Sequence, residues 1–209
     1  MSFLVVFDVD STLIDQEAIE LLATHSGTRQ QVALITERAM KGEIDFSASL
    51  MERVALLAGL DEDILTKVAD ELSPTKGAVE LIEAIHSAGG YAAAVSGGFI
   101  QLLEPLKITL NLDFAKANTL EVVDGKLSGR VIGELVDSSA KAETLLALVK
   151  KLEIDIAQTI AIGDGANDLK MMKEAGLSIA FCAQPIVRES ADIVIDARDL
   201  SQVIALLPN

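Results

Sequence analysis

The chain has 209 residues, half of them hydrophobic, which favours one folded domain carrying at most a modest insertion. It has 17 Lys and Arg against 32 Asp and Glu, a formal net charge of −15 that would repel nucleic acid. Aromatic residues make up only 3%, so stacking platforms for single-stranded nucleic acid are not expected. The same charge would repel an anionic substrate, so a phosphate site needs local positive charge or a metal ion.

The sequence also argues against a membrane or secreted protein. The first residues, MSFLVVFDVD, lack the basic region and long apolar run of a signal peptide. No apolar run approaches the ~20 residues that span a bilayer. Cys182 is the only cysteine, so no disulfide can form within the chain. We therefore expect a soluble, cytoplasmic protein without a membrane or nucleic-acid partner.

The N-terminal third reads as one strand followed by a long helical block. The continuous apolar run at residues 3–7 predicts a strand buried on both faces. Residues 16–72 then read as helical, with breaks expected near Gly27, Lys41-Gly42 and Gly59. Because no strand-like run interrupts this block, we interpret it as an insertion that packs over one edge of a sheet.

The remaining chain alternates between strand and helix patterns. Strands are expected at 91–95, 159–162, 177–181 and 193–195, a hairpin at 119–132 turning at Asp124-Gly125, and helices after the loop at 73–77 as far as residue 88, at 139–152 and at 199–206. Such alternation implies a parallel sheet covered by helices. The sequence therefore predicts the α/β class.

Three polar clusters directly follow predicted strands: Asp8-Val9-Asp10, Ser96-Gly97-Gly98 and Gly163-Asp164-Gly165. In open parallel sheets, ligands bind outside the carboxyl ends of the strands. We therefore expect the three clusters to converge on one crevice, with the helical insertion above it.

The first cluster carries two carboxylates. Asp8 and Asp10 are two residues apart, so both can face the same way at the end of a strand. Two such carboxylates repel each other unless a cation or a shared proton intervenes. An isolated pair would be an ordinary solvated strand end, but Ser11 and Thr12 add local hydrogen bonding here. The segment DVDST therefore favours a functional site.

Asp164 and Asp168 form a second acidic cluster in the segment GDGANDLKM. The alternative is a helix N-cap preceded by a glycine turn, since Asp168 is expected at a helix start. Several carboxylates on one crevice, without sulfur or imidazole, suit a hard cation that prefers oxygen ligands. Mg²⁺ is the natural choice.

The segment Ser96-Gly97-Gly98 offers a hydroxyl and backbone N–H groups at an expected strand-to-helix turn, a geometry that binds phosphate oxygens. Lys141, near the start of a predicted helix, could supply positive charge to the same phosphate. Taken alone, the first could be an ordinary turn and the second a solvated surface charge.

Taken together and in order, DxDxT at residues 8–12, Ser96, Lys141 and GDxxxD at residues 163–168 resemble the signature of the haloacid dehalogenase superfamily. The resemblance implies a Rossmann-like parallel-sheet core at residues 1–14 and 73–209, with a small helical cap at 15–72 inserted after the first strand. It also implies a phosphatase. Asp8 would be its nucleophile and Asp10 its general acid and base, with Lys141 as a third catalytic residue.

The same resemblance implies a Mg²⁺ ion held by Asp8, the backbone carbonyl of Asp10, and Asp164. Asp168 would stand behind these ligands and orient Lys141 or a metal-bound water.

Within that superfamily, the segments DVDSTLI, VSGGF and GDGANDLKMM resemble the phosphoserine phosphatases. This resemblance implies hydrolysis of O-phospho-L-serine to L-serine and phosphate, through an aspartyl-phosphate, in serine biosynthesis. Glu17 would receive the substrate ammonium group and Arg53 its carboxylate. The substrate-binding residues implied are Glu17, Met40, Phe46, Arg53, Ser96, Gly97, Lys141 and Asn167, with Met40 and Phe46 as the apolar lining.

Other functions stay open at this point. A relative in the same superfamily could hydrolyse another small phosphomonoester or pass the phosphate to homoserine, as a phosphoserine:homoserine phosphotransferase would. A phosphate- or metal-sensing protein without turnover is disfavoured, because Asp8 and Asp10 are both present. We expect a small-molecule substrate and a monomer or homodimer.

Overall fold

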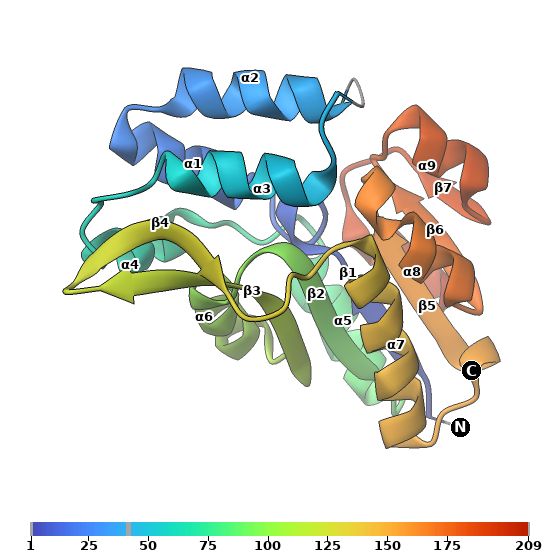
Figure 1. Ribbon diagram of the computed structural model, residues 1–209. Helices are drawn as coiled ribbons and strands as arrows, with labels where there is room; N and C mark the ends of the chain where they lie inside the picture. The colour runs from blue at the N-terminus through green and yellow to red at the C-terminus, as the bar shows by residue number, and fades with distance from the viewer. Residues whose placement is uncertain (1, 41–42, 209) are drawn as a thin grey trace.

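The computed structural model describes residues 2–40 and 43–208, except for the side chain of Met40. Its strands are β1 (Leu4–Phe7), β2 (Tyr91–Phe99), β3 (Phe114–Val123), β4 (Lys126–Ile132), β5 (Thr159–Gly163), β6 (Leu177–Phe181) and β7 (Ile193–Ile195). They form one seven-stranded sheet in the order β4-β3-β2-β1-β5-β6-β7. Every pair is parallel except the β3–β4 hairpin. The predicted α/β class is confirmed, with helices on both faces of the sheet (Figure 1).

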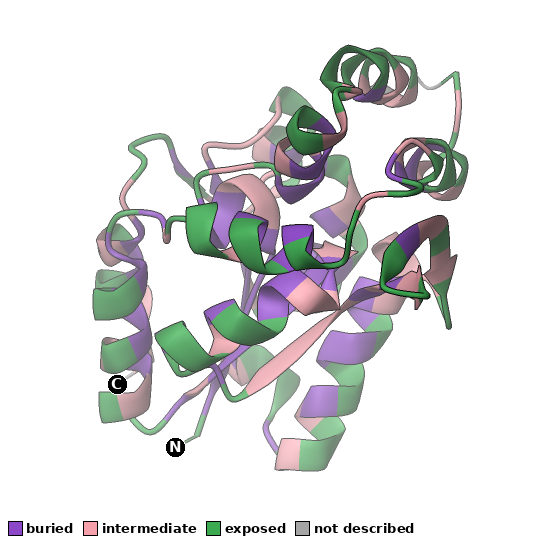
Figure 2. Cartoon of the chain, turned by 90° about the vertical axis from the view of Figure 1, so that its left-hand side faces the viewer, coloured by how far each residue is buried: buried purple, intermediate pink, exposed green. Residues whose placement is uncertain are grey.

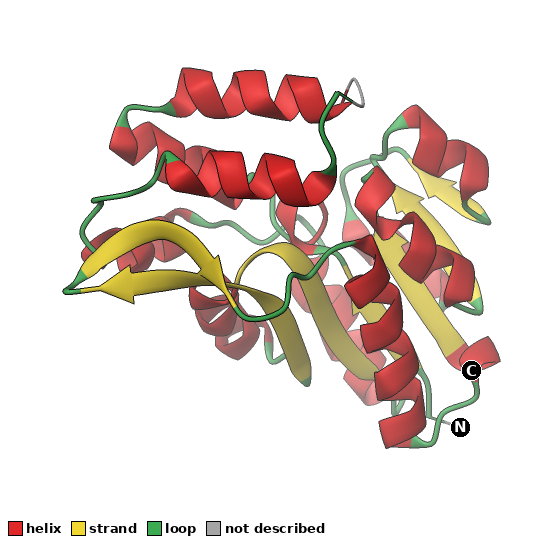
Figure 3. Cartoon of the chain, viewed as in Figure 1, coloured by secondary structure: helices red, strands yellow, loops and turns green. Residues whose placement is uncertain are grey.

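The helices are α1 (Ala18–Ser26), α2 (Arg29–Met40), α3 (Phe46–Ala55), α4 (Asp63–Glu71), α5 (Ala78–Ser87), α6 (Ile100–Leu110), α7 (Ser138–Leu152), α8 (Leu169–Glu174) and α9 (Pro185–Ser190). Figure 3 shows α1, α2 and α3 gathered above the end of the sheet from which the hairpin extends. Within the described residues, no helix combines the length and apolarity needed to cross a membrane.

Strand β1 explains why the first apolar run is continuous. Val5 and Phe7 enter a core cluster with apolar residues of α5 and α6 on one face of the sheet. Leu4 and Val6 enter a second cluster with residues of α7 and α8 on the other face. Both faces are covered, so every residue of the strand is buried, as in other parallel sheets (Figure 2).

Helices α1 to α4, which lie between β1 and α5, share a third apolar cluster, which includes Leu22, Leu50 and Val68. Leu120 and Leu127 of the β3–β4 hairpin join this cluster, so the hairpin supports the helices from below. We call α1 to α4 the helical unit. The expected breaks at Gly27 and Gly59 are confirmed, and both glycines have positive φ angles, of 72° and 86°. The break expected at Lys41-Gly42 falls outside the described residues.

Several expected elements differ in the structure. Strand β2 continues through Ser96-Gly97-Gly98 to Phe99, because β3 pairs with it again at Phe99–Asn118 after a register shift. The expected strand-to-helix turn at residues 96–98 is therefore wrong. The C-terminal helix is a 3-10 helix, Leu200–Leu206. The helix expected to start at Asp168 is confirmed as α8, for which Asp168 is the N-cap residue. Helix α6, which carries Pro105 inside it, and the short helix α9 were not predicted.

Candidate active site

The carboxyl end of β1 positions Asp8 and Asp10. The N–H of Asp8 continues the strand ladder by donating to the carbonyl of Ile162, at 2.9 Å. The chain then coils into the tight π-type turn Val9–Leu13 instead of running straight on. This turn brings Asp10 back toward the helical unit, where its Oδ1 accepts a hydrogen bond from the N–H of Ala18 at 2.8 Å.

Lys141, in the first turns of α7, joins two buried carboxylates. Its Nζ donates to Oδ1 of Asp8 and to Oδ1 of Asp168, the latter at 2.7 Å. The other oxygen of Asp168 accepts from the backbone N–H groups of Asp164 and Gly165, at 3.2 and 3.1 Å. Asp168 therefore fixes both the lysine and the loop after β5.

Asp164 faces the same space from the loop after β5. Its Oδ1 accepts a hydrogen bond from the buried Thr12 hydroxyl at 3.1 Å. Carboxylate oxygens of Asp8, Asp164 and Asp168 lie within 4.8 Å of one another, and this set of oxygen donors fits a hard cation such as Mg²⁺. Because both oxygens of Asp168 already accept hydrogen bonds, Asp8 and Asp164 are better placed as ligands.

The electrostatics of these carboxylates also favour a cation. Burial and the charge of Asp168 raise the pKa of Asp8 well above its usual value, against the opposing effect of Lys141. Burial, then Asp168 and Glu17, raise the pKa of Asp164 to about 7. A bound divalent cation would reverse both effects, because it favours the ionised carboxylates.

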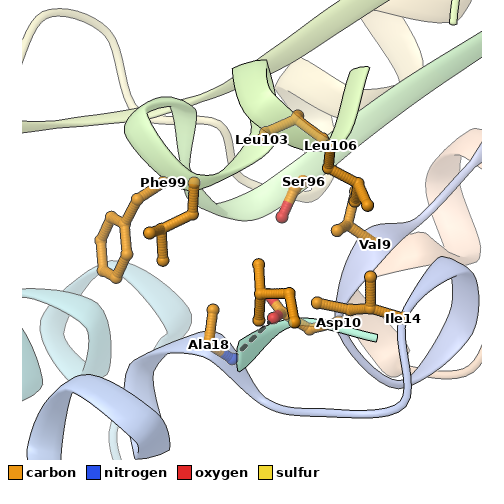
Figure 4. A pocket seen from close by; sticks show the side chains of 10 residues that line it. Val9, Asp10, Ile14, Ala18, Ser96, Phe99, Leu103 and Leu106 are labelled. Atoms are coloured by element: carbon orange, nitrogen blue, oxygen red, sulfur yellow. Dashed lines mark hydrogen bonds between the residues drawn. The ribbon is translucent and has the colours of Figure 1, made fainter. Parts of the chain in front are cut away.

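Asp10 lies beside a small, mostly apolar cavity. Figure 4 shows it with Ser96 at a small cavity whose other lining residues are apolar: Val9, Ile14, Ala18, Leu72, Phe99, Leu102, Leu103 and Leu106. Burial, and next the charge of Glu17, raise the pKa of Asp10 to about 7, while the hydrogen bond from Ala18 lowers it. The carboxyl group can therefore give or take a proton near neutral pH, as a general acid and base must.

Residues 96–98, near the end of β2, lie beside Asp10. The buried Oγ of Ser96 accepts from the N–H of Gly98 at 2.8 Å. A Cβ at Gly98 would lie 2.8 Å from Oδ2 of Asp10, so only glycine permits this approach. Asn118, which was not predicted as a site residue, donates from Nδ2 to the carbonyl of Gly97 at 2.9 Å. A single asparagine in a hairpin strand gives no sequence signal of this support.

The helical unit forms the upper wall of the site. The ring of Phe46 in α3 lies against Gly97, so close that a Cβ there would be 2.8 Å from Cζ of the ring. Arg53, seven residues along the unbroken α3, is half-buried, which lowers its pKa, whereas Glu17 and Asp10 raise it. Glu17 accepts a hydrogen bond from the Ser11 hydroxyl at 2.6 Å. The Glu17 residue as a whole is exposed, but its carboxylate is partly buried, and this burial raises the pKa of Glu17.

Two further expected site residues have less defined surroundings. Asn167 is half-buried in the loop after β5, and its Oδ1 lies so close to Gly165 that a Cβ there would be 2.5 Å away. Met40 ends α2, and its side chain lies outside the described residues.

Residues 5–173 match the family described as haloacid dehalogenase-like hydrolase. The chain is 51% identical to a phosphoserine phosphatase of Streptomyces coelicolor, covering 98% of this chain and 50% of that protein. It is 48% identical to a phosphoserine phosphatase of Streptococcus thermophilus, covering 98% of this chain and 95% of that one. The chain thus spans half of the first relative and nearly all of the second.

Two solved structures are similar over nearly the full chain. One is described as a phospho-aspartyl intermediate analogue of phosphoserine phosphatase, with a TM-score of 0.94, 43% identity and 99% coverage of both chains. The other is described as a substrate-bound phosphoserine phosphatase complex, with a TM-score of 0.95, 43% identity, and coverage of 100% of this chain and 99% of that one.

Proposed function

Because the chain belongs to the haloacid dehalogenase-like hydrolase family, we propose that it hydrolyses O-phospho-L-serine to L-serine and phosphate in serine biosynthesis. The observation that carries this proposal is Asp8, a buried carboxylate at the end of β1 that is hydrogen-bonded to the buried Lys141. A carboxylate held beside a cationic side chain suits nucleophilic attack on a phosphate ester. We also propose that the enzyme acts in the cytoplasm, as a monomer or homodimer.

In the first step, Asp8 attacks phosphorus in line and the bond between phosphorus and the serine oxygen breaks. Asp10 gives its proton to the departing oxygen, which leaves as the serine hydroxyl. In the second step, Asp10 takes a proton from the water that attacks the aspartyl-phosphate, so that phosphate leaves and Asp8 is restored. The pKa of about 7 for Asp10 supports both roles.

The phosphoryl oxygens are held by Ser96, the N–H of Gly97, Asn167 and Lys141, whose orientation Asp168 fixes. Asp8, the backbone carbonyl of Asp10, and Asp164 would hold Mg²⁺. When bound, this ion neutralises the carboxylates and polarises the phosphoryl group.

Selection of the amino-acid part of the substrate falls to the helical unit, which we propose as a cap formed by residues 15–72 on a core of residues 1–14 and 73–209. Glu17 would receive the ammonium group and Arg53 the carboxylate. Phe46 and Met40 would line the site with apolar surface. The contact of Phe46 with Gly97 supports a cap that closes over the end of β2 and excludes water during the reaction.

The test is phosphate release in Mg²⁺ across a panel of phosphomonoesters that includes phosphoserine, phosphothreonine and para-nitrophenyl phosphate, with and without homoserine. We expect a preference for phosphoserine without an acceptor, and no turnover by Asp8→Asn, whose far-UV spectrum should be unchanged. Turnover that depends on homoserine would instead identify a phosphotransferase, and full activity of Asp8→Asn would refute the nucleophile.

Arg53→Ala tests the substrate assignment. Loss of a charge-assisted contact to the substrate carboxylate should lower kcat/KM for phosphoserine by about 10²-fold, with a much smaller effect on para-nitrophenyl phosphate. An equal effect on both esters would contradict the role given to Arg53.

A further inference from the structure

Arg198, close to the C-terminus in sequence, contacts the link between the active-site turn and the helical unit. Its Nε donates to Oδ1 of Asp15 at 2.7 Å. Its Nη2 donates to the backbone carbonyls of Ser11 and Ile14, at 3.2 and 3.3 Å. One guanidinium group therefore holds three acceptors of the chain that leaves β1 for α1.

The residues after Arg198 hold the second link, through which the chain returns from the helical unit. The N–H of Leu200 donates to the carbonyl of Lys76 at 2.8 Å, and the Lys76 ammonium pairs with Asp199 at 2.8 Å. The two links are also bonded to each other, since the N–H of Asp15 donates to the carbonyl of Ser73 at 3.1 Å. Residues 198–200 thus anchor both links on the core side.

The carbonyl of Ser11 that Arg198 holds belongs to an unusual backbone. Ser11 has a φ of 58°, in the left-handed region that residues with a side chain rarely adopt. It follows Asp10 directly, and its hydroxyl donates to Oε1 of Glu17 at 2.6 Å. A change in this turn would therefore move the general acid and the residue proposed to receive the ammonium group together.

We propose that Arg198 is a positioning residue, which holds the Val9–Leu13 turn in the geometry that aims Asp10 and Glu17 at the substrate. The inference rests on the proposed function, because it assigns a consequence to those two carboxylates. The alternative is an ordinary surface ion pair, since the side chains of Arg198 and Asp15 are 38% and 44% exposed. Such pairs contribute little, but this one adds two bonds to backbone carbonyls of the catalytic turn.

The test variant is Arg198→Met, which keeps the aliphatic stem and removes the donors. Its matched control is Arg188→Met, because Arg188 is also 38% exposed and pairs with one carboxylate, Asp196, away from the turn. Both are assayed in Mg²⁺ with phosphoserine and with para-nitrophenyl phosphate, whose leaving group needs no proton and carries no ammonium.

For Arg198→Met we expect a loss of about tenfold in kcat/KM for phosphoserine, the size of one or two lost charge-assisted bonds, and at most about a twofold loss for para-nitrophenyl phosphate. Arg198→Lys should recover part of the loss, and Arg188→Met should change neither ester. Equal losses for both esters, or no loss for phosphoserine, would overturn the positioning role.

Amide hydrogen exchange of residues 9–18 in the free protein tests, without an activity assay, whether Arg198 holds the Val9–Leu13 turn in place. The exchange should be about tenfold faster in Arg198→Met than in wild type or Arg188→Met, and unchanged exchange would overturn the proposal. A wild-type protein that cleaves para-nitrophenyl phosphate but not phosphoserine would instead refute the proposed substrate, while the exchange result would still decide whether Arg198 braces the turn.

Discussion

Nζ of Lys141 lies 2.7 Å from Oδ1 of Asp168, and both side chains are fully excluded from solvent. Burial alone would lower the pKa of the lysine, but the charges of Asp168 and Asp8 together raise it above its usual value. Lys141 therefore stays charged, and its position depends on Asp168 as much as on α7. A buried charge that loses one of two partners is costly, whereas an exposed one is rehydrated.

Asp168→Ala should thus lower the free energy of unfolding by about 3 kcal/mol and reduce kcat by at least about 10²-fold, because it leaves Lys141 and two backbone N–H groups without their acceptor. Denaturant unfolding and steady-state kinetics measure the two effects. Asp61→Asn, which weakens the exposed pair with Lys126, is the control and should leave both unchanged. A stable, active Asp168→Ala would show that the pair is dispensable.

The raised pKa of Asp164 leads to a second prediction, about how the free energy of unfolding depends on pH when no metal is present. Its pKa is about 7 in the folded protein against an ordinary value of 3.8, so between these values the folded protein keeps a proton that the unfolded chain has lost. This contribution is fully present below pH 3.8 and is lost as the pH rises through 7. Asp164→Asn should therefore be stabilised relative to wild type more at pH 8 than at pH 5 in chelator, as measured by denaturant unfolding.

Magnesium should stabilise the wild type more than Asp164→Asn, which is the opposite of the difference expected in chelator. At pH 8, Mg²⁺ should raise the unfolding midpoint of the wild type and raise that of Asp164→Asn much less, since this carboxylate is one of the proposed ligands of the ion in the folded state. Asp124→Asn, in the exposed hairpin turn, is the control and should respond to the ion as wild type does. An identical response of Asp164→Asn and wild type would remove Asp164 from the metal site.

Much of the fold could be predicted because the informative residues are local. The apolar run of β1, the alternation after residue 88 and the helix that spans Phe46 and Arg53 are all visible in short windows. The carboxyl ends of neighbouring parallel strands lie at the same edge of a sheet. Asp8 and Asp164 were therefore expected in one crevice, although they are 156 positions apart in the sequence.

The supporting contacts could not be predicted, because each depends on residues distant in sequence. Asn118 holds both the carbonyl of Gly97 and the N–H of Val136, and Arg198 reaches back to Ser11 across the whole chain. A single Asn or Arg has no spacing pattern from which such a role can be read. The extension of β2 has the same origin, since it depends on renewed pairing with β3 and not on the strand's own residues.

Asp10 leads to a prediction about the pH profile of the reaction. As the proposed general acid, Asp10 must be protonated when the leaving group departs, so kcat/KM for phosphoserine should fall as the pH rises through the pKa of Asp10, which burial and the charge of Glu17 raise above its ordinary value. The charge of Glu17 helps to raise this pKa, so Glu17→Gln should move the alkaline limb to lower pH, besides weakening binding. Glu20→Gln, one helical turn further on, is the control and should leave the limb in place. If the alkaline limb does not move in Glu17→Gln, the charge of Glu17 does not influence the pKa of Asp10.

Phe46 and Gly97 allow closure of the helical unit to be tested directly. A Cβ on Gly97 would lie 2.8 Å from Cζ of Phe46 and 3.3 Å from Cε2, so Gly97→Ala keeps its backbone N–H but pushes the ring away. We expect Gly97→Ala to raise KM for phosphoserine about tenfold, since closure then requires the ring to move.

Phe46→Ala decides whether that ring is the cause. It removes the obstacle, so the double variant Phe46→Ala/Gly97→Ala should bind phosphoserine no worse than Phe46→Ala alone, and the two single effects should fail to add. The measurement is a double-mutant cycle on kcat/KM, with amide exchange of α3 reporting closure independently. Strictly additive effects would mean that Gly97→Ala acts only on the proposed contact between Gly97 and the phosphate. They would also mean that Phe46 does not contact Gly97 when the substrate is bound.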